Sequence, residues 1–241
     1  DYLDCLNNIS IGPHCGDANY TGDNNIAIGA SALGALTTED DNVAIGFESL
    51  NGNNSQGNTC VGFRTGKAIT SGDFNLILGY DAGQSGSPGG AVTTGSNQVC
   101  LGDENIANAH IQVDWTIASD KRDKTDVSPM NLGLEFINQL EPVTYRWDKR
   151  SKYSKDQSVS PDGTHKEEQL EGGFLAQDVE AIEEQYGHKL SDKTNLTFHS
   201  SEDEKMYGIK YSKFVPMLVK AVQELSAEVE ELKKEKNNGS N

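Results

Sequence analysis

The segment Asn25-Ile26-Ala27-Ile28-Gly29 decides how the first half of this 241-residue chain folds, because close variants of it recur at regular intervals. The shared pattern is an amide residue, a mostly apolar triplet and a glycine. It returns at residues 8–12, 42–46, 58–62, 75–79 and 98–102. The steps from glycine to glycine are 17, 17, 16, 17 and 23 residues. A period of this length is typical of a chain built from stacked short units.

Each copy of the repeat predicts one coil of a β-solenoid. The apolar side chains alternate as in a short half-buried strand, while the glycine and the Asn/Asp-rich flanks permit the positive φ of a sharp corner. One coil cannot bury its own apolar face, so the coils must stack, and a narrow solenoid often needs other chains to complete its core. The pattern resembles the trimeric β-roll head repeats of bacterial autotransporter adhesins and of phage fibres. We therefore expect a mainly β, trimeric fibre domain over residues 1–112.

Two features of the repeat carry further predictions. Cys60 and Cys100 occupy the triplet position held elsewhere by small or apolar residues, so we expect them to pack in the core. The four cysteines have irregular spacing, which favours neither a disulfide framework nor a zinc site, and we expect them to be reduced, with a Cys5–Cys15 pair as the alternative. The longest step contains Gly83–Gly90, which predicts an exposed loop, either a flexible connector or a receptor contact.

Composition excludes several classes of function. The formal net charge is −17, and residues 1–114 hold thirteen acidic side chains against two basic ones. Such a chain repels phosphates and anionic lipid, so nucleic-acid partners and membrane surfaces are disfavoured. The sequence contains no run of 18 apolar residues, so we do not expect it to insert into a membrane. The histidines are scattered, so we expect no metal site, and we expect no cofactor. The start at Asp1 without an initiator Met suggests a fragment of a longer polypeptide.

The second half mixes helix and strand patterns and predicts an α+β domain over residues 113–241. Pro142 and Gly187 are the expected helix terminators. We expect helices, strands and one insertion-like loop at Leu132–Leu140 (helix), 143–147 (strand), 151–171 (loop), 176–186 (helix) and 206–210 (strand).

A heptad pattern ends the chain and predicts a coiled-coil helix at about residues 211–235. A helix docked on its own domain is the alternative, because three heptads are few. Val at one core position with Leu at the other favours two strands. The two core positions are held by Val215, Val222 and Val229, and by Tyr211, Leu218, Leu225 and Leu232.

The junction between the halves reads Ser119-Asp120-Lys121-Arg122-Asp123-Lys124 and sets a hydroxyl five residues before an amine. A lysine amine acts as a base only when desolvation or a neighbouring cation favours its neutral form. Lys124 would then accept the proton of Ser119, whose oxygen attacks the carbonyl of Ala118 and gives an ester that water opens. The predicted cut separates Ala118 from Ser119, and the alternative is an ordinary solvated loop.

The motifs that follow this segment in the sequence favour the predicted cut. Residues 130–147, 173–180 and 207–211 followed by the heptads form an ordered set that resembles the C-terminal intramolecular chaperone domain of phage tailspikes and tail fibres. The same self-cleaving module occurs in endosialidase tailspikes and in myelin regulatory factor, and the resemblance covers about residues 115–241. It implies three strands in the coiled coil and a catalytic pair at Ser119 and Lys124. Asp120 and Arg122 match the motif's other usual positions and would shape the cleavage turn.

Together these patterns predict the distal part of a viral tail fibre or tailspike, assembled in the host cytoplasm and carried on the virion. An acidic homotrimeric β-roll would contact a host cell-surface receptor, either a glycan or a protein. The C-terminal domain would drive trimerisation and folding of the fibre and release itself as a single-turnover serine endopeptidase. The alternative is a structural trimerisation or adhesin module that does not cleave.

Overall fold

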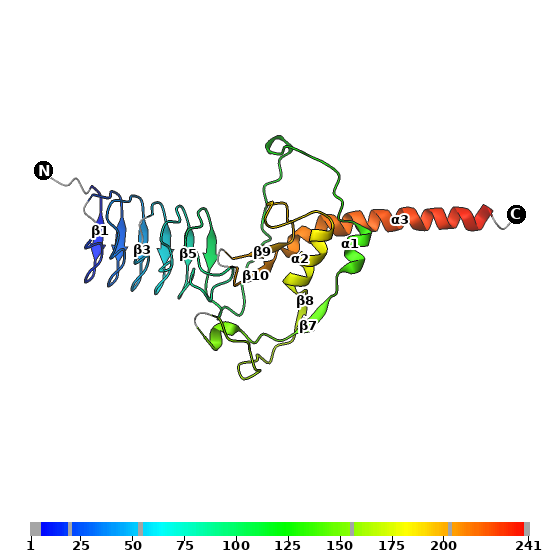
Figure 1. Cartoon of the computed structure of the whole chain (residues 1–241). Coiled ribbons are helices and arrows are strands. Elements are labelled where there is room, and N and C mark those ends of the chain that lie inside the picture. Colours follow the sequence, from blue (N-terminus) through cyan, green and yellow to red (C-terminus); the bar gives the residue numbers. More distant parts are fainter. Residues whose placement is uncertain (1–5, 19–20, 53–54, 155–156, 202–203, 239–241) are drawn as a thin grey trace. The chain divides into compact units, whose positions relative to one another are not determined.

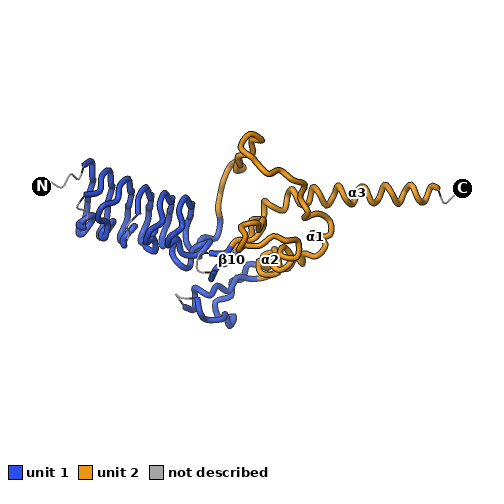
Figure 2. The backbone as a smooth tube through the Cα atoms, turned by 45° about the horizontal axis from the view of Figure 1, so that its top comes forward, with its two compact units in different colours: residues 1–108, 146–169, 200–207 blue, residues 109–145, 170–199, 208–241 orange. Residues whose placement is uncertain are grey.

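The computed structural model describes residues 6–18, 21–52, 55–154, 157–201 and 204–238. The chain forms two compact units (Figure 2). Unit 1 comprises residues 1–108, 146–169 and 200–207, and unit 2 comprises residues 109–145, 170–199 and 208–241. The boundary predicted between residues 112 and 113 stays a prediction, since a cluster of contacts is not the same as an independently folding domain.

A β-solenoid makes up the first part of unit 1, as the repeat predicts (Figure 1). Its six three-residue strands pair in chain order into one parallel sheet. Equivalent triplet positions face each other, as where Ala27 pairs with Ala44 and Ala44 with Cys60. The strands are β1 (Ile9–Ile11), β2 (Ile26–Ile28), β3 (Val43–Ile45), β4 (Thr59–Val61), β5 (Leu76–Leu78) and β6 (Val99–Leu101).

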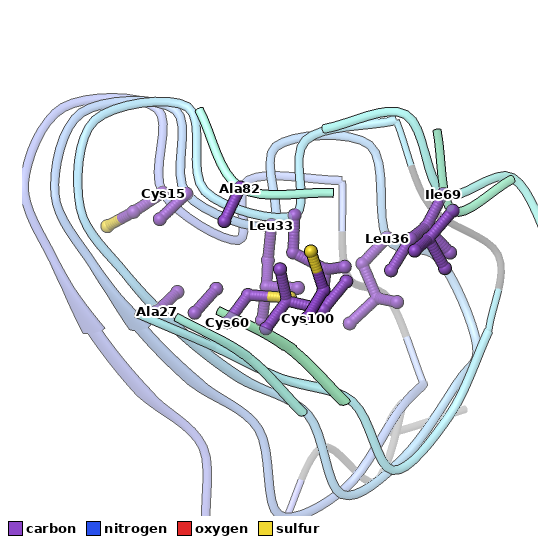
Figure 3. Close-up of a cluster of buried hydrophobic side chains, with 13 residues drawn as sticks. Cys15, Ala27, Leu33, Leu36, Cys60, Ile69, Ala82 and Cys100 are labelled. Atoms are coloured by element: carbon purple, nitrogen blue, oxygen red, sulfur yellow. The ribbon is translucent and has the colours of Figure 1, made fainter. Parts of the chain in front are cut away.

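The solenoid core is formed by the middle residue of each triplet from β2 onward, packed against leucines and an isoleucine from the opposite wall (Figure 3). Cys60 and Cys100 lie in this core, which confirms their predicted packing role. Burial raises the pKa of the Cys60 thiol to about 12, so its reactive thiolate form is strongly disfavoured. Cys15, Cys60 and Cys100 are free thiols, and Cys5, the alternative partner of Cys15, lies outside the described residues.

The amide that begins each repeat explains why the coils stack in register. The side-chain oxygen of Asn25 accepts the backbone N–H of Asn42 at 2.9 Å, and that of Asn42 accepts the N–H of Asn58 at 3.0 Å. The Asn42 side chain also donates to the carbonyl of Ser55 across the coil at 2.9 Å. Asn42 and Asn58 are fully buried. An asparagine fits because it offers both a donor and an acceptor, whereas an aspartate lacks the donor.

The glycine that ends each repeat is required by space as well as by conformation. Gly46 has φ +135°, and a Cβ there would lie 2.1 Å from the carbonyl oxygen of Gly62 in the next coil. The corners therefore stack more closely than any side chain permits.

The prediction of an exposed loop at Gly83–Gly90 is right only in part: the stretch has no helix or strand, but its exposed part is confined to residues 88–89. Gly83 and Gly90 are buried, and Ser87 is fully buried. The Ser87 hydroxyl donates to the carbonyl of Asp81 at 3.2 Å, and Gln84 donates its side-chain amide to the carbonyl of Arg64 at 2.8 Å. These hydrogen bonds turn a glycine-rich stretch into a widened coil of the solenoid.

Unit 2 has its own core, made by Leu132, Phe136, Val179, Phe214 and Met217. The mixed α/β character predicted for the second half is confirmed. Strands β7 and β8 pair antiparallel, and β9 lies beside β10. The elements of the second half are η1 (Lys121–Asp123), α1 (Leu134–Gln139), β7 (Val143–Tyr145), η2 (Arg150–Lys152), β8 (Glu171–Gly173), α2 (Ala176–Gln185), β9 (Phe198–Ser200), β10 (Tyr207–Ile209), η3 (Tyr211–Lys213) and the 25-residue α3 (Phe214–Asn238).

Two carboxylates fasten the elements of unit 2. The buried Glu183 of α2 accepts the backbone N–H of Leu196 at 2.6 Å and the hydroxyl of Thr197 at 2.8 Å. Glu224 of α3 accepts the N–H of Leu134 at 2.7 Å, at the start of α1. This backbone hydrogen bond, with a further contribution from Lys220, lowers the pKa of Glu224. The long helix is thereby fixed to its own unit along one side.

We predict that Asn42→Ala destabilises the solenoid, because it leaves the buried Asn58 N–H without its acceptor. One unpaired buried group costs roughly 1–3 kcal/mol. Chemical denaturation followed by circular dichroism should show a lower midpoint. Asn108→Ala, an exposed position outside the repeat, is the control and should leave the midpoint unchanged. Equal midpoints for both variants would contradict the amide ladder.

Candidate functional site

The structure brings Ser119 and Lys124 together. A single 3₁₀ turn, η1, lies between them, and its chain reversal is closed by the Lys124 N–H donating to the carbonyl of Lys121 at 3.3 Å. The Lys124 Nζ lies 2.6 Å from the Ser119 Oγ. This distance is within reach of a direct proton transfer between the two groups.

Asp120 and Arg122 form a second side-chain contact within the same turn. The Asp120 carboxylate accepts the backbone N–H of Arg122 at 2.9 Å and caps the turn, and it forms an ion pair of 2.6 Å with the guanidinium. The side-chain hydrogen bond from Arg122 lowers the pKa of Asp120, and the same bond raises the pKa of Arg122. The four residues of the motif thus form two contacts around one turn, with Ser119 and Lys124 forming the other.

All residues from Ala118 to Lys124 are exposed in the single chain. The pair therefore has the contact that a nucleophile and its base need, but not the enclosure that removes water from the base. Across the described ranges, no group of three or more His, Cys, Asp or Glu side chains could hold a metal ion. The chemistry available at this turn is that of a hydroxyl and an amine.

Comparison with protein families connects this turn to known proteins. Residues 119–188 match the family model of peptidase S74, described as the chaperone of endosialidase. This segment of the chain is thus similar to the chaperone of endosialidase. The match begins at Ser119, the residue predicted to follow the cut. This family fits a role in a phage tail fibre or tailspike, and it suggests a trimeric fibre protein. Neither the curated proteins nor the solved structures gave a match to the chain.

Part of the segment that matches this family, residues 146–169, lies in unit 1 and contacts the last coil of the solenoid. Lys149 donates to the backbone carbonyl of Glu104 at 2.7 Å, and Lys152 donates to the side chain of Asn105. The nearly buried Gln157 donates to the carbonyl of Ser85. The sequence predicted only an insertion-like loop here. The sequence feature that could have indicated these contacts is the pair of lysines, because their positive charges suit the strongly acidic first half of the chain.

Helix α3 has two different apolar faces. Phe214, Met217 and Ala221 are buried on one face, and Phe214 and Met217 belong to the core of unit 2. The heptad positions lie on another side, where Val222 is 61% exposed and Leu225 is 49% exposed. The rival interpretation, a helix docked on its own domain, therefore accounts for one face and leaves the heptad seam uncovered. No helix among the described residues is long and apolar enough to cross a membrane.

The solenoid also presents an uncovered apolar surface. The outer triplet positions of the sheet are exposed in several coils, as at Ile11 and Leu101. Beside them, the rings of Phe47, Phe63 and Tyr80 stack along successive corners at centroid distances of 5.2 and 5.1 Å. These rings are exposed as well. One chain alone leaves both the sheet face and the heptad seam in water.

Proposed function

We propose that this protein is the distal part of a viral tail fibre or tailspike whose C-terminal domain assembles the fibre as a homotrimer and then releases itself. The observation that carries the proposal is the 2.6 Å contact between Lys124 Nζ and Ser119 Oγ at the first residue of the family match. A serine hydroxyl next to a lysine amine is an arrangement that can carry out nucleophilic cleavage of a neighbouring peptide bond.

The cut follows from these two side chains. Neutral Lys124 takes the proton from Ser119 Oγ, and the oxygen attacks the carbonyl carbon of Ala118. The bond from that carbon to the Ser119 nitrogen breaks, and the nitrogen receives the proton, which leaves Ala118 joined to Ser119 Oγ as an ester. Water hydrolyses the ester to a carboxylate at Ala118 and a free hydroxyl at Ser119. Each chain can perform this reaction once.

A trimer can bury the two apolar surfaces that a single chain leaves exposed. A heptad seam of Val and Leu is exposed along α3, and such a seam is normally buried between helices. The apolar sheet face of the solenoid needs a partner for the same reason. Because both surfaces belong to every copy, assembly about one axis can cover the two together.

The contacts at the last coil support the chaperone role. Lys149, Lys152 and Gln157 all follow the proposed cut in the sequence, yet they bind groups of the last solenoid coils. A coil at the end of a solenoid exposes backbone groups and needs a cap. The C-terminal domain supplies this cap while the fibre folds.

The remaining parts of the proposal concern place and partners. The fibre is assembled in the host cytoplasm and carried on the virion, where the acidic β-roll contacts a host cell-surface receptor that is a glycan or a protein. The net charge of −17 argues against nucleic acid as the partner. No cofactor or metal takes part in the proposed cut.

We predict that the wild-type chain yields fragments of 118 and 123 residues, because Ser119 and Lys124 supply the nucleophile and the base. Ser119→Ala and Lys124→Ala should each leave the chain whole while assembly persists. Denaturing mass spectrometry of the purified assemblies after incubation at pH 8 measures the cut.

The matched control is Lys121→Ala, which removes a lysine from the same turn that does not contact Ser119, and it should still cut. A wild-type assembly that keeps its full-length mass after days at pH 8 would contradict the protease assignment. The protein would then be the alternative, a structural trimerisation or adhesin module.

We also predict that Leu218→Asp with Leu225→Asp blocks assembly, because the seam would bury charges without partners. Analytical ultracentrifugation should give three chains for the wild type and smaller species for the variant. Ala227→Asp adds the same charge to an exposed position away from the seam and should leave three chains. An unchanged trimer in the double variant would show that the seam is not a coiled-coil interface.

A further inference from the structure

The stretch leading into the predicted cut has an unexplained pattern of exposed apolar side chains. Ile111, Val113, Trp115 and Ile117 are 52%, 74%, 70% and 71% exposed. They are spaced by two, and Gln112, Asp114 and Thr116 lie between them. An alternation of this kind places one apolar row on one side of an extended chain.

The backbone of the same stretch is not paired with any other described backbone segment, although the Trp115 N–H donates to the side chain of Asp114 at 2.8 Å. Within the parts of the chain that the structure describes, residues 107–119 belong to no helix or strand and make no backbone–backbone hydrogen bond. Ile, Val, Trp and Thr are residues that favour strands. A strand-forming sequence with one apolar side and no backbone–backbone hydrogen bonds has the features of a strand that lacks its neighbouring strands.

We propose that residues 111–117 are an interaction surface for the same segment of two further copies of this chain. In this arrangement the three segments run alongside one another about the axis of the assembly, with the four apolar side chains of each copy directed inward. The inference rests on the proposed function, since it requires the trimer, and it adds the segment through which the chains meet at the cut.

Another copy of the chain is the occupant that the sequence favours. In the sequence, residues 111–117 come after the solenoid sheet that ends at β6 and before the heptad seam of α3, and a single chain leaves both of these surfaces exposed. Strand β6 itself is exposed at Val99, at 68%. A symmetric assembly that covers the surfaces before and after this segment brings the three copies of the segment together as well.

This pairing also has a consequence for the cut. Ile117 is separated by one residue from Ser119, so ordering of the row fixes the backbone at Ala118. The turn that holds Ser119 and Lys124 is exposed in one chain, and three paired segments would exclude water next to it. The row residues are therefore positioning residues for the cut and not catalytic residues.

Cysteine pairs test the arrangement directly. In a Ser119→Ala background, which keeps the chain whole, Ile117→Cys places a thiol in the row and Thr116→Cys places one on the opposite side. Mild oxidation should link copies through Cys at position 117 and not through Cys at 116, because a disulfide needs Cα atoms within about 7 Å. The same background without an added cysteine shows any link made by the native thiols.

Tryptophan fluorescence gives an independent readout. In Ser119→Ala with Trp147→Phe, Trp115 is the only tryptophan. Its emission in the assembly should be shifted to the blue of that of the urea-unfolded chain and should be shielded from iodide.

Analytical ultracentrifugation of the same samples separates the two possible failures. A trimer with an iodide-accessible Trp115, or with equal linking at positions 116 and 117, overturns this inference and leaves the proposed function intact. A monomer overturns the trimer and this inference with it.

Discussion

A narrow coil buries only the inward side chain of its three-residue strand and leaves the outward side chains exposed. The arrangement of the rest of the chain depends on this constraint. From β2 to β6 the middle side chain of each triplet points into the solenoid and is buried, while the flanking side chains point outward. The outward positions are nevertheless Ile, Val and Leu in most coils. A chain that keeps apolar residues on its outer face is adapted to be covered by another surface.

In the proposed function, the same constraint sets the order of assembly and release. A stack of coils has no folded unit smaller than several repeats, so its ends need support while it forms. In unit 1 this support comes from Lys149, Lys152 and Gln157, which belong to the part that the proposed cut would detach. If the bond between Ala118 and Ser119 broke before the chains assembled, the fibre could lose the segment that supports its last coils. An exposed dyad in the single chain agrees with a cut that waits for the other chains.

Sequence reasoning succeeded where a local pattern determines the structure. The repeat predicts the solenoid because Asn42 and Gly46 occupy positions that accept almost no other residue. It was right only in part at Gly83–Gly90, since glycine and serine are typical of open loops, whereas the hydrogen bonds of Gln84 and Ser87 hold much of this loop within a coil of the solenoid. The cap formed by Lys149 and Gln157 could not be predicted, because it joins positions more than 40 residues apart with no shared periodicity. The contact of Ser119 with Lys124 was anticipated from their spacing, whereas their roles in a cut stay a prediction.

In the proposed trimer, each apolar surface that one chain leaves exposed is covered by the two other chains. Electron cryomicroscopy of the Ser119→Ala protein can test this, because the variant is expected to keep the chain whole. We expect three chains about one axis, with the outer side chains of β1 to β6 and the heptad seam of α3 buried between them. Particles of a single chain, or an assembly in which these two surfaces remain in contact with water, would contradict it.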